Sequence, residues 1–276
     1  GGRMSVRCFR GNAELAGIDP ANRGLAYGDG VFETMRVHGG ELPLWPRHLV
    51  RLREGARRLA IPLPDDAVLQ SHAEAVAAGC EAGVLKLLLT RGSGGRGYSA
   101  ASATEAEWML ALHPLPAAAS DALQLVWCDT PLPVQPLLAG IKHCNRLEQV
   151  LARMEVARAG ADEGLVCDTD GQVVSATAAN LLVLRGGRWL TPPLERCGVA
   201  GVLRGWLLEA GLVTVEPLSR DAVLAADALA LCNAVRGILP VGRLGDRNWP
   251  PHPSFDELKA RLSMAYPMFS RPEAAA

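Results

Sequence analysis

Strand-length apolar runs alternate with helix-length amphipathic stretches along this chain, without a regular repeat. Residues 30–38 have the alternating pattern of a strand, and residues 41–45, beyond a Gly39-Gly40 turn, are expected to form a second strand. Further strands are expected at 84–91, 108–113, 123–127, 164–167, 173–177, 181–184, 213–217 and 228–232. Because strands and helices interleave without a regular strand-helix-strand array, the sequence predicts a mixed α/β fold.

Apolar stripes and end signals predict the helices. Pro46 suits a first helical position, and the run from there to the residue before Pro62 has one apolar face. That face consists of Leu49, Leu52, Ala56 and Leu59. An Ala-rich helix is expected at 65–79, and another is expected to follow the Gly-rich segment 197–201 and to end by Ala210.

A capping box predicts the start of one more helix. Asn145 would cap it, and Glu148 would reach back to the cap three residues later. Apolar residues at helical spacing predict its buried stripe, and Gly160 would end it. The stripe consists of Leu147, Val150, Leu151, Met154 and Ala157.

The length of 276 residues suggests more than one core. A Pro- and Ala-rich stretch separates two strands near residue 116 and has the composition of a linker. We therefore expect a smaller N-terminal α/β domain at 4–115, a linker at 116–122, and a larger C-terminal domain at 123–276.

Charge and cysteine usage exclude several classes of protein. The net charge is −1 with no basic block, so nucleic acid is not an expected partner. No apolar run approaches the length of a membrane span, which predicts no membrane association. The seven cysteines include no C-x-x-C pair, so no metal site is indicated and the cytoplasm is the expected compartment.

Lysine is scarce: of 28 basic residues only Lys86, Lys142 and Lys259 are lysines. Lys86 is expected on a strand face and Lys259 on a terminal amphipathic helix, both with their amines in solvent. Lys142 closely precedes the predicted helix cap at Asn145, where partial desolvation would lower its pKa and favour attack on an aldehyde. On these residues alone, a surface-loop lysine remains the simpler alternative.

Several longer motifs resemble one known family. They are Arg23–Glu33, Arg91–Ser99, Gly140–Val150, Asn180-Leu-Leu, Gly198–Arg204 and Cys232-Asn-Ala-Val. Together they resemble the fold-type IV pyridoxal-phosphate enzymes, which include D-amino-acid and branched-chain aminotransferases and 4-amino-4-deoxychorismate lyase. The loop at 91–99 and the segment around Lys142 are most similar to the lyase. The resemblance spans nearly the whole chain and implies a two-domain fold of this type.

The resemblance implies a site for pyridoxal 5'-phosphate in which Lys142 carries the cofactor and then acts as general acid and base. Arg51 matches the family's phosphate-binding arginine, although its place beside the apolar helix face also fits a solvated side chain. The N–H groups of Val202 and Leu203 would bind the phosphate at a helix start, as would the turn at Ala234. An ordinary glycine loop and simple burial are the alternatives for these two segments.

The resemblance also implies substrate contacts and a partner. Arg96 and Tyr98 match positions that face a substrate carboxylate, and Phe32 would border the pocket of a small-molecule substrate. Thr34 matches a threonine proposed to protonate the departing enolpyruvyl group, with simple strand packing as the alternative. The family implies a homodimer with its sites near the domain and subunit interfaces.

One residue departs from the family pattern. Ser175 stands where the family has a glutamate that keeps the pyridine nitrogen protonated, and a neutral hydroxyl stabilises a pyridinium less well. The leading hypothesis is the lyase that converts 4-amino-4-deoxychorismate to 4-aminobenzoate and pyruvate in folate synthesis. The alternatives are a D-amino-acid or branched-chain aminotransferase and a degenerate, non-catalytic paralogue.

Overall fold

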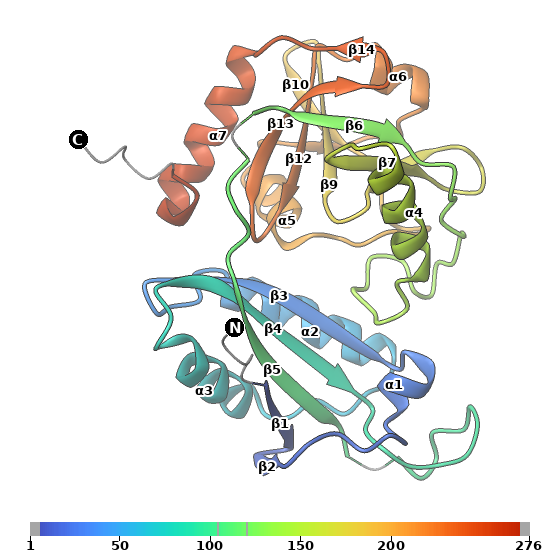
Figure 1. The fold of residues 1–276 in the computed structure, drawn as a ribbon, viewed down its shortest axis with the longest axis vertical. Helices are drawn as coiled ribbons and strands as arrows, with labels where there is room; N and C mark the ends of the chain where they lie inside the picture. Colours follow the sequence, from blue (N-terminus) through green and yellow to red (C-terminus); the bar gives the residue numbers. More distant parts are fainter. Residues whose placement is uncertain (1–5, 104, 120, 271–276) are drawn as a thin grey trace. The chain divides into compact units, whose positions relative to one another are not determined.

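The computed structural model describes residues 6–103, 105–119 and 121–270 (Figure 1). The chain forms two compact units. The first unit extends to Pro116 and includes Ile141–Arg146, and the second contains Ala117–Gly140 and the chain from Leu147 on. The boundary after Pro116 falls within the predicted linker. Ser120 of that linker lies outside the described residues, and so do Met4, Ser5, Thr104 and 271–276 of the predicted domains.

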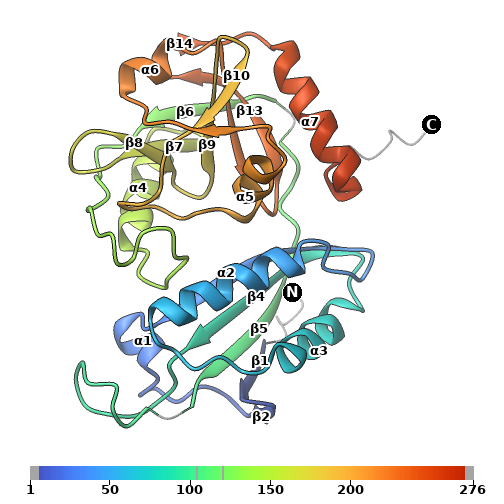
Figure 2. The same cartoon turned by 180° about the vertical axis from the view of Figure 1, so that it is seen from behind.

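An antiparallel sheet with the strand order β2-β1-β5-β4-β3 forms the first unit. Its elements are β1 (Val6–Arg10), β2 (Ala13–Leu15), α1 (Arg23–Tyr27), β3 (Gly30–His38), α2 (Trp45–Arg58), α3 (Asp66–Ala77), β4 (Ala82–Thr90) and β5 (Glu107–Pro114). Figure 2 shows α2 and α3 on the same side of this sheet. Their apolar residues share one core cluster with the strands, and the other face of the sheet, which neither α2 nor α3 covers, is called the open face below.

Alternation along β3 separates the two faces of the first unit. Val31 and Met35 are buried in the core with α2 and α3. Phe32 and Thr34 point to the opposite, half-buried face, because successive strand residues alternate. Glu33 is on the helix-covered face, where a carboxylate needs a partner.

The segment Ile141–Arg146 belongs to the first unit because its backbone pairs with the edge of β3. The Phe32 N–H donates to the Lys142 carbonyl at 3.0 Å, and the Cys144 N–H donates to Gly30 at 3.0 Å. This places Lys142 in the first unit, whereas the sequence assigned it to the domain at 123–276.

The second unit contains one nine-stranded mixed sheet with the order β11-β10-β9-β12-β13-β6-β7-β8, and β14 pairs with β13. Its elements are β6 (Leu123–Trp127), α4 (Leu147–Arg158), β7 (Glu163–Cys167), β8 (Val173–Ala176), β9 (Asn180–Arg185), β10 (Arg188–Thr191), α5 (Val202–Glu209), β11 (Thr214–Val215), α6 (Arg220–Leu224), β12 (Ala228–Asn233), β13 (Gly237–Leu244), β14 (Arg247–Asn248) and α7 (Pro253–Ala265), followed by the 3-10 turn η1 (Pro267–Phe269). One core cluster joins residues of β6, β7, β8, β9, β10, β12 and β13. The predicted mixed α/β class is confirmed.

The predicted strand at 41–45 is wrong. Only one bridge, between His38 and Glu41, continues from β3, and α2 begins at Trp45. Pro43 has no N–H for a strand ladder, and Pro46 favours the first helical turn. The Gly39-Gly40 turn therefore leads almost directly into a helix.

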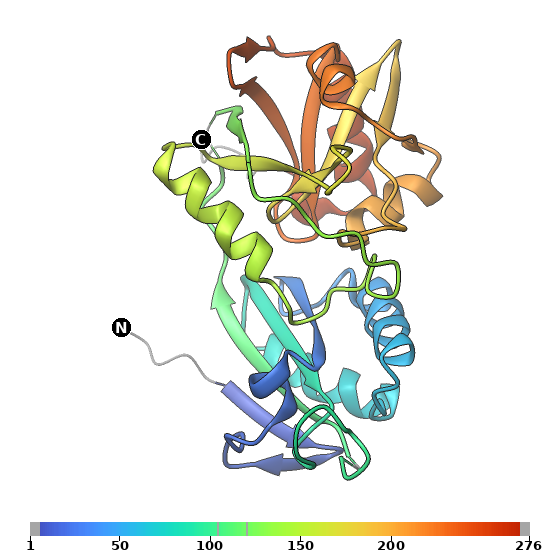
Figure 3. The ribbon, with the colours of Figure 1, turned by 90° about the vertical axis from the view of Figure 1, so that its right-hand side faces the viewer.

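The start and the buried face of α4 also differ from the prediction. The Asn145 side chain donates to the Gly28 carbonyl at 3.0 Å and does not cap α4. The predicted stripe is exposed: Leu147, Val150, Leu151 and Met154 are 74%, 47%, 52% and 54% accessible, and Ala157 is exposed as well. Ala152 and Val156 belong instead to a small buried cluster that also contains Val166 of β7. Figure 3 shows the ribbon of α4 from the side.

No helix among the described residues is long and apolar enough to cross a bilayer.

Candidate active site

Lys142 is a half-buried amine at the edge of the first unit's sheet. Its Nζ lies 4.5 Å from the centre of the Phe32 ring, a cation–π arrangement. Burial, together with the nearby Arg51 guanidinium, lowers the pKa of Lys142 to about 8, and the Glu33 carboxylate only partly offsets this. An amine with a pKa near neutrality is suited to react with an aldehyde.

A buried ion-pair network lies next to this amine. Glu33 is 2% exposed and accepts two hydrogen bonds from Arg51, the bond from Nε to Oε1 being 2.8 Å and the second running from Nη2 to Oε2. His48 Nδ1 lies 2.7 Å from Oε2 of the same carboxylate. Because Arg51 and His48 both come from α2, the network ties that helix to β3.

Protonation in this network follows from its burial. Burial alone would raise the pKa of Glu33, but Arg51 and His48 outweigh it and lower the pKa to about 2. Burial lowers the pKa of His48 below its usual value, against the opposing effect of Glu33. A neutral His48 beside an ionised Glu33 must donate through Nδ1, since the carboxylate has no proton to give.

Arg51 is not the solvated arginine that its helix position also allowed. Its side chain is 15% exposed, and its Glu33 bonds fix the direction of the guanidinium. A fixed, charged guanidinium close to the Lys142 amine is suited to bind the phosphate of a phosphorylated aldehyde.

Phe32 and Thr34 lie two residues apart on the open face of the first unit's sheet. The Phe32 ring borders the Lys142 amine, in agreement with a place at the pocket. Thr34 is half-buried and directly opposite Lys86 of β4 in the strand register. No hydrogen bond that fixes the Thr34 hydroxyl is present among the described residues.

The loop between β4 and β5 is held by the buried Arg23. Its guanidinium donates to the carbonyl oxygens of Gly97 at 3.0 Å, Tyr98 at 3.0 Å and Ser99 at 3.1 Å. The Arg23 Nε donates to Asp29 at 3.1 Å. All these bonds from Arg23 to the loop are accepted by backbone carbonyl oxygens.

Arg96 and Tyr98, the predicted carboxylate contacts, project from this loop. Both are exposed, Tyr98 to 89%, and the Tyr98 ring meets Tyr27 edge-on at 5.5 Å. The structure brings Arg51, Phe32 and Lys142 together in the first unit and leaves Arg96 and Tyr98 on its surface.

In the second unit, the predicted phosphate segment is a true helix start. Gly201 precedes α5, whose first residues are Val202 and Leu203, and no side chain caps this helix. Asn180 holds the approach: its Oδ1 accepts from the Gly201 N–H at 3.1 Å, and its Nδ2 donates to Val199 at 2.9 Å. An uncapped helix start presents N–H groups and a positive dipole end to an anion.

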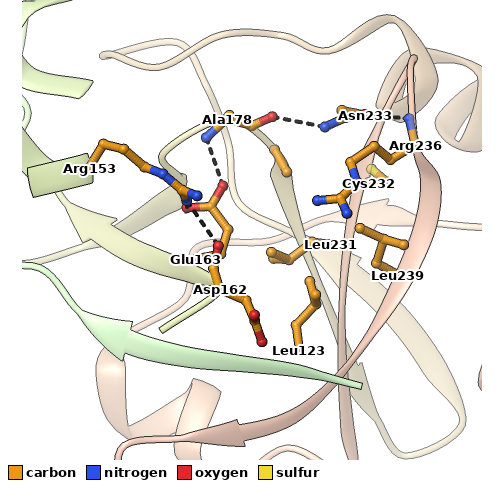
Figure 4. A pocket seen from close by; sticks show the side chains of 11 residues that line it. Leu123, Arg153, Asp162, Glu163, Ala178, Leu231, Cys232, Asn233, Arg236 and Leu239 are labelled. Carbon is orange, nitrogen blue, oxygen red and sulfur yellow. Dashed lines mark hydrogen bonds and ion pairs between the residues drawn. The ribbon is translucent and has the colours of Figure 1, made fainter. Parts of the chain in front are cut away.

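Asn233 shapes the turn at Ala234. Its Oδ1 accepts from the N–H groups of Val235 and Arg236 at 3.1 and 2.8 Å, and its Nδ2 donates to Ala178 at 3.1 Å. Figure 4 shows the bonds of Asn233 to Ala178 and Arg236, and the bond from the Ala178 N–H to the Glu163 carboxylate. The turns that follow β8 and β12 are therefore linked to each other.

Ser175 lies on β8 and is 7% exposed. Its hydroxyl donates to the Ala176 carbonyl at 2.8 Å, so its oxygen keeps lone pairs for another donor. This oxygen is suited to accept one hydrogen bond but carries no charge.

A cavity of about 310 Å³ lies beside these turns (Figure 4). Arg153, Glu163, Asn233 and Arg236 contribute its polar lining. None of the residues predicted to bind the cofactor lines it, so this cavity is not assigned to the cofactor.

Each unit, taken by itself, offers groups suited to a phosphorylated aldehyde. The first unit offers a reactive amine and a fixed guanidinium, and the second offers an uncapped helix start, a backbone turn and a hydroxyl. The family model described as amino-transferase class IV matches residues 30–244. The chain belongs to this family. Class IV enzymes use pyridoxal 5'-phosphate, which is therefore the cofactor.

Relatives within the class IV family include lyases. The chain is 34% identical over 230 residues to the aminodeoxychorismate lyase of Vibrio harveyi, with 80% of this chain and 84% of that one covered. It is 30% identical over 188 residues to a bifunctional aminodeoxychorismate lyase and D-amino acid transaminase of Mycobacterium tuberculosis, covering 60% and 63%. The crystal structure of the 4-amino-4-deoxychorismate lyase of Pseudomonas aeruginosa is similar with a TM-score of 0.87 and 42% identity, covering 93% and 98%.

Sequence reasoning missed the residues that support this class IV site. Glu33 and His48 were given no role, although a charged residue in an apolar strand face is a signal of a buried ion pair. Arg23 was part of a matching motif without an assigned contact. Lys86 was expected in solvent, yet its Nζ lies 5.1 Å from the Phe32 ring centre.

We expect Glu33→Gln to lower the free energy of unfolding at pH 7 by about 3 kcal/mol, because a pKa lowered from 4.5 to about 2 corresponds to that contribution. Wild type has this contribution above about pH 4.5 and loses it as the pH falls towards 2, so the difference between the two proteins should narrow over that range. Urea unfolding between pH 7 and pH 3 measures it. A difference that stays constant over this range would contradict the assignment.

Pyridoxal phosphate fixed with borohydride should label Lys142. Only the neutral amine reacts, and at pH 7 a pKa of about 8 makes that form roughly 300-fold more abundant than in an ordinary lysine. Labelling should rise through pH 8, with peptide mapping by mass spectrometry as the measurement. Lys259, on α7, serves as the internal control, and predominant labelling of Lys86 or Lys259 would refute the assignment.

Proposed function

We propose that this class IV enzyme is a lyase that converts 4-amino-4-deoxychorismate to 4-aminobenzoate and pyruvate, a reaction of folate synthesis. The observation that carries the proposal is the Lys142 amine, with its pKa of about 8 beside the fixed Arg51. The two relatives of this name at 34% and 42% identity support the same activity.

In this proposal each described group has one task. Arg51 of the first unit is assigned to the phosphate, as are the start of α5 and the turn at Ala234 of the second unit. The Ser175 oxygen, whose own proton goes to the Ala176 carbonyl, would accept a hydrogen bond from the protonated ring nitrogen. Pyridoxal phosphate held by these groups would supply an electron sink for the substrate ring carbon that carries the amine. Lys142 then takes the proton from that carbon.

The atoms of the reaction balance without a further reactant. As the ring carbon loses its proton, the ring becomes aromatic. The bond between the neighbouring ring carbon and the ether oxygen breaks, and its electron pair stays on that oxygen. The enolpyruvate that leaves gains a proton at its methylene carbon, which makes pyruvate. We assign the donation of that proton to Thr34, on the open sheet face, with the proton taken by Lys142 returning to Thr34 to complete the cycle. The ring carboxylate is assigned to Arg96 with Tyr98.

Ser175 favours the lyase over a transaminase. A transaminase must stabilise negative charge on the cofactor ring and return the proton elsewhere, which a carboxylate at the ring nitrogen assists. The lyase gains its driving force from the aromatic ring that forms, so it tolerates a neutral hydroxyl better. A D-amino-acid or branched-chain aminotransferase remains the second candidate, favoured by the bifunctional relative.

The test is release of 4-aminobenzoate by the cofactor-loaded protein. We expect turnover of 4-amino-4-deoxychorismate to exceed amino transfer to a keto acid by at least about tenfold, because the aromatic product drives only the lyase reaction. Lys142→Ala should abolish both activities and the visible absorbance of the bound cofactor. Amino transfer without 4-aminobenzoate would establish the second candidate, and a colourless protein would indicate a non-catalytic paralogue.

The proposal includes a homodimer. The exposed stripe on α4 offers an apolar helix face for a second copy, since such stripes are rarely left in water. Arg96 and Tyr98 are exposed in a single chain, which also fits a site that a second copy helps to enclose. All seven cysteines are free, which supports the cytoplasm as the compartment.

Leu151→Arg should convert the dimer to a monomer, with the dissociation constant raised at least about a hundredfold, because an arginine would be buried unpaired at this interface. Light scattering coupled to size exclusion measures the mass. Met264→Arg, at an 81% exposed position of α7, is the matched control and should leave the dimer intact. A Leu151→Arg protein that remains dimeric would place the interface elsewhere.

A further inference from the structure

Lys86 lies in the middle of β4, on the open face of the first unit's sheet. It is directly opposite Thr34 in the register of β3 and β4. Two residues further along β4, Leu88 is opposite Phe32. Side chains that face each other across neighbouring strands are within contact range. Lys86 and Thr34 therefore form one small polar patch on this face.

The Lys86 and Lys142 amines share one aromatic ring. Lys86 Nζ is 5.1 Å from the Phe32 centroid, and Lys142 Nζ is 4.5 Å from it. The Lys86 charge contributes to the lowered pKa of Lys142, after burial and Arg51. It also opposes burial at Cys144, whose thiol pKa is raised to about 11. Lys86 thus belongs to the surroundings of the reactive amine.

Lys86 has no acidic partner among the described residues, where the Phe32 ring is its one charge-specific contact. Lys142 and Arg146 add positive charge to the same neighbourhood. Like charges held together, partly out of water, leave the region ready to bind an anion. Arg36 lies further along the same face but already has a partner.

The proposed substrate carries two carboxylates, one on the ring and one on the three-carbon side chain. Arg96 and Tyr98 account for only the first of these. Resting on the proposed function, we infer that Lys86 binds the side-chain carboxylate and so holds the methylene carbon beside the Thr34 hydroxyl. Lys86 is a specificity-determining residue that also binds the carboxylate of the pyruvate product.

The two products separate the two carboxylate sites. Pyruvate carries the carboxylate assigned to Lys86, and 4-aminobenzoate carries the one assigned to Arg96. In the full-length, cofactor-loaded enzyme, Lys86→Met should weaken pyruvate inhibition by about tenfold to a hundredfold, the usual effect of losing one charge-assisted hydrogen bond. Inhibition by 4-aminobenzoate should stay within about twofold. Arg96→Met should show the reverse pattern.

Control variants separate this role from a structural one. Lys86→Arg keeps the charge and should retain most of the pyruvate inhibition, while Lys259→Met on α7 should match the wild type. Thermal unfolding and cofactor absorbance show whether each variant is folded and loaded. The same ligands can be titrated by cofactor absorbance, so binding is measured even in a variant with little turnover.

The inference would be overturned if Lys86→Met weakened inhibition by pyruvate and by 4-aminobenzoate equally, or weakened neither. Loss of pyruvate inhibition in Lys86→Arg would also overturn it. If wild type releases no 4-aminobenzoate, the proposed function fails on its own evidence. The absorbance titration of pyruvate against 4-aminobenzoate then still decides whether Lys86 selects the smaller carboxylate.

Discussion

A carboxylate buried between a strand and a helix determines the geometry around the Lys142 amine in the first unit. Glu33 occupies a strand position that would otherwise be apolar, and it is stable there only because Arg51 and His48 from α2 surround it. The same bonds fix the guanidinium that faces the phosphate in the proposed site. They also place a negative charge close enough to Lys142 to limit the fall of its pKa. The ion pair between Glu33 and Arg51 therefore both holds α2 against β3 and sets the charge around the Lys142 amine.

The second unit uses a different principle. The buried cation at the predicted phosphate segment, Arg204 of α5, donates to the Pro192 carbonyl, and two asparagines set the backbone of two turns. Asn180 holds the approach to α5, and Asn233 holds the turn at Ala234. Side chains of this kind leave the backbone N–H groups of the helix start available. In the proposed site, Ser175, which is close by in sequence, would supply a neutral hydroxyl contact in place of a charged one.

Much of the fold could be predicted because local patterns determined it. The alternating burial of residues 30–38 and the buried helix face with Leu52 and Ala56 each depend on packing against a neighbouring element. The sequence predicted both. The face of α4 was not, because periodicity shows that a helix has an apolar side but not what covers it. The strands β1, β2, β10, β13 and β14 were missed. β2 and β14 span only three and two residues, too few to show an alternating pattern, although β2, β10 and β14 each pair with the strand just before them. For the site, Lys142 and Arg51 were identified by motif, whereas Lys86 depends on strand register, which no local pattern contains.

The way Arg23 holds the loop after β4 bears on how this family diversifies. Its guanidinium contacts carbonyl oxygens at three successive residues and no loop side chain. The shape of the loop is thus independent of which side chains it carries at 96 and 98. A change of residue at either position would alter what the loop recognises without unfolding it. In such a loop, new substrate preferences can arise by single substitutions while the anchoring arginine stays in place.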